Sequence, residues 1–238
     1  MKNIIQLGEL SIEITRKDIK NVHLTVHPPD GRVSLSAPIN TRLEVARAYA
    51  ISKLSWIKLQ QDKLLKQPRE TPREFVKRES HYFWGRRYLL DVIVTEEKQK
   101  IIVDHKRIQL FVKPNSNKDK KAEIMYEWQK ASLHEYIQGV IPKWEKILGV
   151  KVKSYFVQKM KTKWGSCNFK SQNIRLNTEL VKKPKDLVEY VVVHEMVHLI
   201  EPTHNDHFIT LMNKYYPSWR EARLELNSLP LGHATWDK

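Results

Sequence analysis

The sequence predicts an α+β protein: a β-rich N-terminal region that contains one long helix, followed by a second α+β domain. Residues 1–115 contain several runs in which apolar and polar residues alternate, as they do in half-buried strands. Residues 122–238 combine long helical patterns with one strand-rich stretch. Between them, NSNKDKKAE (residues 115–123) is polar and lysine-rich, which predicts a domain boundary.

The first region begins with strand patterns in SIEITR (residues 11–16) and VHLTVHPPDGRVSLSAP (residues 22–38). The Pro-Asp-Gly in the second run predicts a hairpin turn. Residues 41–67 then predict one long helix with a single apolar stripe. We expect Thr41 to be its N-cap, because Glu44 three residues later completes a capping box.

The remaining elements follow from the same patterns. Residues 86–114 (RRYLLDVIVTE, KIIVDH and RIQLFVKP) predict three further strands in an antiparallel set. Residues 123–149 predict a helix that ends at a glycine, and residues 152–180 predict two or three strands. Residues 183–200 predict a helix with Pro184 before its first turn, and residues 207–229 supply one or two more helices.

Composition indicates a folded protein of the cytoplasm. Apolar residues make up 41% of the chain and charged residues 29%, and no apolar run approaches the ~20 residues that a membrane span needs. The N-terminus has acidic residues where a signal peptide needs an unbroken apolar segment. The only cysteine, Cys167, cannot form an internal disulfide, which is typical of a reducing compartment. We therefore expect no membrane partner, while the sequence leaves the oligomeric state open.

The chain is strongly basic, with a formal net charge of +15. Residues 1–115 carry +9 of this charge and the rest +6, so the excess is not confined to one tail. Such a surface can attract nucleic acid or acidic partners, or it can be a well-solvated surface with no partner. No sequence signature of a zinc finger or an RNA-recognition sheet accompanies the charge. Nucleic acid therefore remains a candidate partner.

Four histidines are concentrated in VVVHEMVHLIEPTHNDHF, residues 191–208, and a glutamate directly follows the first of them. On a helix, His194 and His198 lie one turn apart and point the same way, which suits two imidazole ligands of one Zn²⁺. Glu195 directly follows His194 and can reach a water on the metal without being a ligand. The surrounding residues are mostly apolar, so burying these polar groups is costly unless a metal pairs with them. The pattern favours a zinc hydrolase over a pair of structural histidines.

A catalytic zinc takes three protein ligands and keeps a fourth position open. Pro202 ends the helix soon after His198, and the chain can then fold back, so His204 is the first candidate for the third ligand. Four other residues are alternatives: Glu201, Asp206, His207 and Glu221.

Residues 161–208 resemble the YgjP-like zinc metallopeptidases, relatives of the SprT and Spartan groups. The match is dense over about 50 residues, and the N-terminal Pro-Asp-Gly hairpin also resembles that family. Thr203 is a departure, because many relatives have Asn or Asp before the third histidine. The matching residues are Trp164, Gly165, Ser166, Cys167, Asn177, Tyr190, Val191, His194, Glu195, His198, His204 and Phe208.

The resemblance implies a zincin-like metallopeptidase domain that hydrolyses peptide bonds in protein or peptide substrates. It implies that His194, His198 and His204 hold Zn²⁺ and that Glu195 is the catalytic base. By analogy with other zincins, the Trp-Gly-Ser-Cys segment is expected at the edge of the cleft, where a peptide can add as a strand.

Other interpretations stay open. The main rival is a nucleic-acid-associated binding protein whose metal site is structural or vestigial, and a fourth protein ligand such as His207 would favour it. Cys167 could be a nucleophile, although a small packed residue is the more common role for such a cysteine. Tyr190 lies four residues before His194, so it could donate to an oxyanion or belong to the core.

Overall fold

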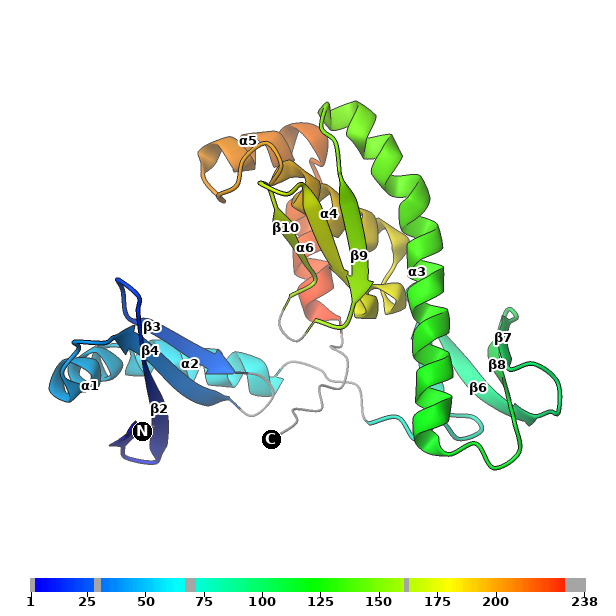
Figure 1. Ribbon diagram of the computed structural model, residues 1–238, viewed down its shortest axis with the longest axis horizontal. Coiled ribbons are helices and arrows are strands. Elements are labelled where there is room, and N and C mark those ends of the chain that lie inside the picture. The colour runs from blue at the N-terminus through cyan, green and yellow to red at the C-terminus, as the bar shows by residue number, and fades with distance from the viewer. Residues whose placement is uncertain (1–2, 28–30, 67–71, 161–162, 230–238) are drawn as a thin grey trace. The chain divides into compact units, whose positions relative to one another are not determined.

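The computed structural model describes the whole chain except residues 1–2, 28–30, 67–71, 161–162 and 230–238 (Figure 1). It confirms the α+β fold class, with three separate sheets and six α-helices among the described residues. The chain forms two compact units, Met1–Pro68 and Arg69–His233. Within the described ranges, no helix has both the length and the apolar character that a membrane span requires.

The first unit is a four-stranded sheet with two helices packed on its core. The order in the sheet is β1-β2-β4-β3, and β2 runs parallel to β4. Its buried apolar residues come from alternate positions of the strands and from both helices. The elements are β1 (Asn3–Leu7), β2 (Leu10–Lys17), β3 (His23–His27), β4 (Arg32–Pro38), α1 (Leu43–Ser52) and α2 (Leu54–Lys66). Strands β3 and β4 pair antiparallel, as the predicted hairpin requires, whereas residues 28–30 of its turn lie outside the described residues.

The predicted long helix is wrong in one respect, because it is two helices that meet at Lys53. The hydroxyl of Ser52 donates to the carbonyl of Tyr49, a local bond that competes with continuation of the helix. The predicted capping box is also wrong. The N-cap position is Arg42, which makes no side-chain capping bond, and the backbone N–H of Thr41 instead donates to Pro38 in the turn after β4. Residue 67, the last of the predicted helix, lies outside the described residues.

The second unit begins with another four-stranded sheet, in the order β5-β6-β8-β7. Its strands are β5 (Ser80–Phe83), β6 (Arg86–Val94), β7 (Lys100–Val103) and β8 (Arg107–Val112). The predicted antiparallel set is wrong for β6 and β8, which run parallel, while β7 pairs antiparallel with β8 at the edge. Leu90, Ile108 and Leu110 are almost completely buried, so the two apolar strands occupy the centre and the less buried β7 takes the edge.

The rest of the second unit contains a three-stranded sheet and the helices that cover it. The order is β10-β11-β9, with β9 parallel to β11 and β10 antiparallel to β11. Strand β10 is therefore an edge strand, and it contacts α4. The elements are α3 (Lys118–Leu148), β9 (Ser154–Gln158), β10 (Gly165–Asn168), β11 (Asn173–Asn177), η1 (Thr178–Lys182, a 3₁₀-helix), α4 (Lys185–Val197), α5 (Asp206–Tyr215) and α6 (Trp219–Ser228).

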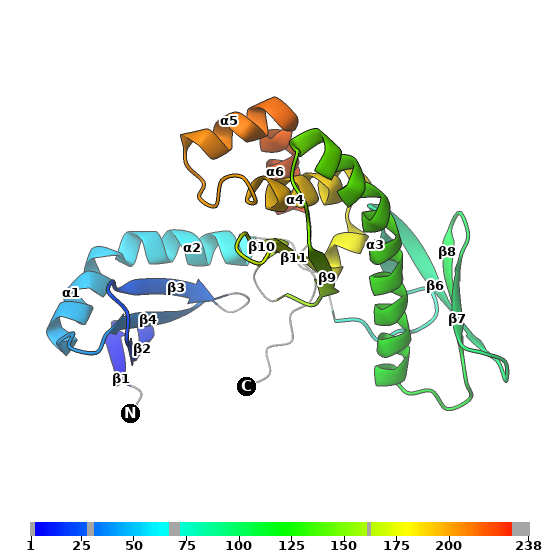
Figure 2. The ribbon, with the colours of Figure 1, turned by 45° about the horizontal axis from the view of Figure 1, so that its top comes forward.

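Helix α3 connects the two sheets of the second unit (Figures 1 and 2). It contacts β7 and β8 as well as β9, η1 and α4. Residues 118–123 form the start of this helix, and the side chain of Asn117, the residue before it, caps it by accepting from the N–H of Lys120. The predicted boundary at residues 115–123 lies inside the second compact unit, Arg69–His233.

The β5–β6 turn makes a second connection to the segment that enters α4. The backbone N–H of Trp84 donates to Val181 (2.8 Å) and that of Gly85 donates to Lys182 (3.1 Å). Gly85 has φ +77°, and a Cβ there would lie 2.7 Å from Cγ of Pro184. Only glycine therefore allows the turn to approach so closely.

Candidate metal centre

Helix α4 carries His194 and Glu195 on a rigid, largely buried support. Its central residues Val191, Val192 and Val193 are at most 4% exposed. The regular helix ends at Val197, and His198 follows as the C-cap residue in right-handed helical conformation. The rings of His194 and His198 therefore keep the relation of one helical turn, with their centroids 5.1 Å apart.

His204 reaches the same point from the loop between α4 and α5. Its Nε2 atom lies 3.0 Å from Nε2 of His194, and its ring centroid lies 4.5 Å from that of His198. One nitrogen from each of the three rings lies within 4.8 Å of the others. Phe208 packs against all three rings, with centroid distances between 4.7 and 5.0 Å. Three converging imidazoles are a donor set that fits Zn²⁺.

Glu201 shapes the loop that brings His204 back. Its backbone carbonyl accepts a hydrogen bond from Nδ1 of His198 (3.0 Å), which leaves Nε2 of that ring available to a metal. Its carboxylate accepts bonds from the backbone N–H and the hydroxyl of Thr203, and these bonds lower the pKa of Glu201 to about 2. Nδ1 of His207 lies 3.4 Å from the same carboxylate. Glu201 thus contacts the loop, and neither it nor His207 belongs to the histidine group.

The other two alternative ligands, Asp206 and Glu221, also lie outside that group. Asp206 is the first residue of α5, and Glu221 lies in the first turn of α6. Among the described His, Cys, Asp and Glu residues, the group comprises three histidines and no fourth side chain.

Burial keeps the imidazoles of His194 and His198 in the neutral form that binds a metal. The pKa of His194 is lowered to about 3, mainly by burial and also by the neighbouring charges of His198, His204 and Arg223. Burial also lowers the pKa of His198. Nδ1 of His194 is buried without a hydrogen-bond partner among the described residues. A cation on the opposite nitrogen would offset the cost of burying this ring, so the site fits a metal ion.

Glu195 lies beside the histidines in a buried position, with 7% of its surface exposed. Burial raises the pKa of its carboxyl to about 7, and the positive charge of Lys163 opposes this rise. Gly165 of β10 leaves room for it, because a Cβ at that position would lie 2.8 Å from both Cγ and Oε1 of Glu195. The glycine of the Trp-Gly-Ser-Cys segment thus sets how closely β10 approaches the carboxylate.

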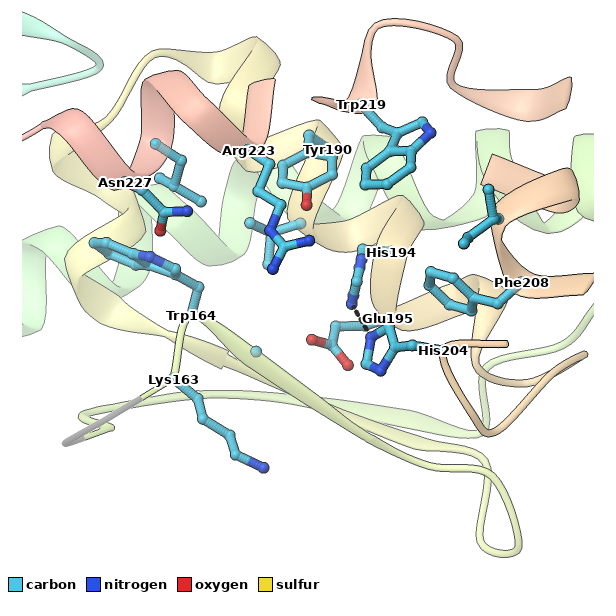
Figure 3. Close-up of a pocket in the computed structure, with 14 residues that line it drawn as sticks. Lys163, Trp164, Tyr190, His194, Glu195, His204, Phe208, Trp219, Arg223 and Asn227 are labelled. Carbon is cyan, nitrogen blue, oxygen red and sulfur yellow. Dashed lines mark hydrogen bonds between the residues drawn. The ribbon is translucent and has the colours of Figure 1, made fainter. Parts of the chain in front are cut away.

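His194, His204 and Glu195 border a cavity of about 580 Å³ (Figure 3). Sequence patterns did not identify Lys163, Trp219 or Arg223 as part of this site, because no local spacing connects them to the histidines. Trp164 and Trp219 contact the core, and both also line the cavity. The full lining is Lys163, Trp164, Gly165, Tyr190, Val191, His194, Glu195, His204, Phe208, Ile209, Trp219, Arg223, Leu226 and Asn227.

Cys167 and Tyr190, whose roles the sequence leaves open, also lie near the site. Burial raises the pKa of the Cys167 thiol to about 11, and the charge of Glu195 adds to this rise. A protonated thiol is a poor nucleophile, so the structure argues against cysteine catalysis. Tyr190 is 5% exposed, and it both belongs to the core and lines the cavity.

Comparison with known proteins gives the family. The family of YgjP-like metallopeptidase domains matches residues 20–229. A search of curated proteins found no match. Similar solved structures include two metallopeptidase zymogens, jannalysin of Methanocaldococcus jannaschii and abylysin of Pyrococcus abyssi. Jannalysin is 23% identical over 38% of this chain and 92% of its own, with a TM-score of 0.35. Abylysin is 19% identical over 40% of this chain and 90% of its own, with a TM-score of 0.34.

The family match covers most of the chain, including the three histidines, Glu195 and the Trp-Gly-Ser-Cys segment. The chain belongs to the YgjP-like metallopeptidase family, as the resemblance of residues 161–208 predicted.

Proposed function

We propose that this protein is a zinc-dependent peptidase in which His194, His198 and His204 hold the metal. The observation that carries the proposal is the convergence of the three ring nitrogens within 4.8 Å, at a cavity that Glu195 also lines. A catalytic zinc has three protein ligands and an open position, and three is the number of side chains in this group. This count among the described residues favours the enzyme over the rival with a closed, structural site.

Glu195 is the proposed general base and acid. A zinc ion in the site would supply a Lewis acid that makes water more acidic and polarises the scissile carbonyl. A nearby cation also favours the charged carboxylate of Glu195, which is the form that accepts a proton. Glu195 accepts a proton from the attacking water and later delivers it to the leaving amine. Its buried place against Gly165 holds it in one position for both transfers.

The substrate is proposed to be a peptide in extended conformation. Strand β10 pairs with β11 on one side, and no described strand pairs with its other side. Lys163, Trp164 and Gly165, at the start of this strand and just before it, line the cavity beside Glu195. A peptide that added to the free edge through backbone hydrogen bonds would therefore pass along the carboxylate.

The dependence of peptide hydrolysis on zinc tests the proposed function. We expect the purified protein to cleave an unfolded protein such as casein, to lose this activity with a zinc chelator, and to regain it when about one equivalent of Zn²⁺ is added. Fluorescence of labelled casein measures cleavage, and elemental analysis measures zinc per chain. Cleavage that persists after the metal has been removed would contradict the proposal.

Replacing Gly165 with alanine tests the position of Glu195. The new Cβ would lie 2.8 Å from the glutamate, so the carboxylate must move. We expect kcat to fall by about 100-fold, the effect of a displacement of roughly 1 Å, while zinc content stays unchanged. Gly139→Ala is the matched control, because a Cβ there meets nothing within 4 Å. Equal activity of the two variants would show that Glu195 tolerates the displacement.

Nucleic-acid binding remains a prediction. The candidate regions are two basic stretches, around residues 66–78 and at residues 115–123, and the first of them is only partly described. A titration of labelled DNA at about 50 and 200 mM salt would test it, because phosphate contacts weaken steeply with salt.

A further inference from the structure

The cavity beside the histidines has an excess of positive charge. Lys163 and Arg223 line it, whereas Glu195 is the one acidic residue of its described lining. In Figure 3, the side chain of Arg223 extends from α6 into the space beside His194. Arg223 therefore places a positive charge in the cavity, and the proposed roles of the three histidines and Glu195 do not use this charge.

Arg223 forms no ion pair with a described carboxylate. Arg220 of the same helix differs, because it donates to Oδ1 of Asn213 (2.8 Å) and lies over the ring of Trp219 (4.4 Å). The guanidinium of Arg223 thus keeps its planar set of donors available to a ligand in the cavity.

Tyr190 supplies a second donor from α4. Its hydroxyl points toward the guanidinium of Arg223 (Figure 3), and no described residue accepts a hydrogen bond from it. The ring is held in place, with its centroid 6.0 Å from that of His194 and 5.9 Å from that of Tyr216. Val191 and Leu226 line the same cavity, and such apolar neighbours strengthen a charge-assisted hydrogen bond. The guanidinium of Arg223 and the hydroxyl of Tyr190 are hydrogen-bond donors in the same cavity, so they can bind the two oxygens of one carboxylate.

We propose that Arg223 and Tyr190 form a subsite that binds a carboxylate group of the peptide substrate beside the metal centre. This inference rests on the proposed peptidase function and names the class of substrate for the same site. The carboxylate can come from an acidic side chain near the scissile bond or from the C-terminus of the peptide. Both sources present the same pair of oxygens, so the experiment must separate them.

The test compares peptides of one sequence that differ only in this group. In one set, each position in turn is Glu or Gln, and in the other the C-terminus is a free acid or an amide. Binding is measured by fluorescence anisotropy on the zinc-loaded Glu195→Gln protein, which is expected to bind without cleaving. Hydrolysis of the same peptides is measured with Glu195 intact. Each measurement is repeated with Arg223→Gln, and with Arg220→Gln as a control for the loss of one positive charge on α6.

We expect one acidic peptide to bind and react about 10- to 100-fold better than its neutral partner, as for a charge-assisted bond. Arg223→Gln should remove this preference, and Arg220→Gln should keep it. Tyr190→Phe should reduce it. The set that shows the preference identifies the source of the carboxylate.

Three outcomes separate the two proposals. Carboxylate-selective binding without any hydrolysis would overturn the peptidase function and keep the subsite. Hydrolysis with no preference for acidic peptides would overturn the subsite and keep the function. A loss of kcat in Arg223→Gln that is equal for all peptides would also overturn the subsite, because Arg223 would then act on the scissile carbonyl.

Discussion

The His194→Ala protein is expected to lose its zinc and its peptidase activity together. His194 provides one of the three converging nitrogens, and two remaining imidazoles do not make a three-ligand site. We expect zinc to fall from about one per chain to nearly none after dialysis, and hydrolysis to fall to background. The same result is expected for His198→Ala. Elemental analysis and a peptide assay on the same samples measure both effects.

His207→Ala is the matched control for this result. His207 is a histidine of the same loop, but its Nδ1 faces the carboxylate of Glu201 and it lies outside the histidine group. We therefore expect this variant to retain zinc and most of its activity. Loss of zinc from His207→Ala to the same extent as from His194→Ala would indicate a fourth ligand, and it would favour a closed structural site.

Glu195→Gln is expected to separate metal binding from catalysis. Glutamine has nearly the shape of glutamate, so the contact with Gly165 and the fold should persist. It cannot accept and return a proton, and we expect kcat to fall by about 100- to 10,000-fold. Zinc content should remain that of the wild type. Elemental analysis together with the peptide assay measures this separation.

Two results would contradict this role. Zinc loss as complete as in His194→Ala would make Glu195 a ligand. Unchanged hydrolysis would remove it from the reaction. Circular dichroism at the same protein concentration shows whether a loss of activity comes from unfolding instead.

The sequence predicts the centre of the site well because the information there is local. The spacing of His194 and His198 fixes their relative direction once the segment is helical. Pro202 predicts that the helix stops soon after His198; the structure ends α4 at Val197 and brings the ring of His204 to the other two. The far wall of the cavity could not be predicted this way, since Arg223 lies on α6, which α5 separates from α4 in the sequence.

Parts of the fold were missed for related reasons. The stripe of apolar residues over 41–67 is continuous, so the pattern alone does not show the break at Lys53, where the hydroxyl of Ser52 donates to the carbonyl of Tyr49. The alternation of apolar and polar residues predicted β6, β7 and β8 as strands, but it does not show which strands pair with each other. The parallel pairing of β6 with β8 depends on how deeply each strand is buried, which only the packed sheet reveals.

The contact of the β5–β6 turn with the start of α4 has a consequence for how the protein unfolds. Trp84 and Gly85 donate to the carbonyls of Val181 and Lys182, just before the helix that carries two of the histidines. Opening the β5–β6 hairpin would leave these carbonyls without their donors and free the N-terminal end of α4. We therefore expect the four-stranded sheet of the second unit and the histidine site to lose their structure in one cooperative transition, in which a bound metal would stabilise residues far from its ligands.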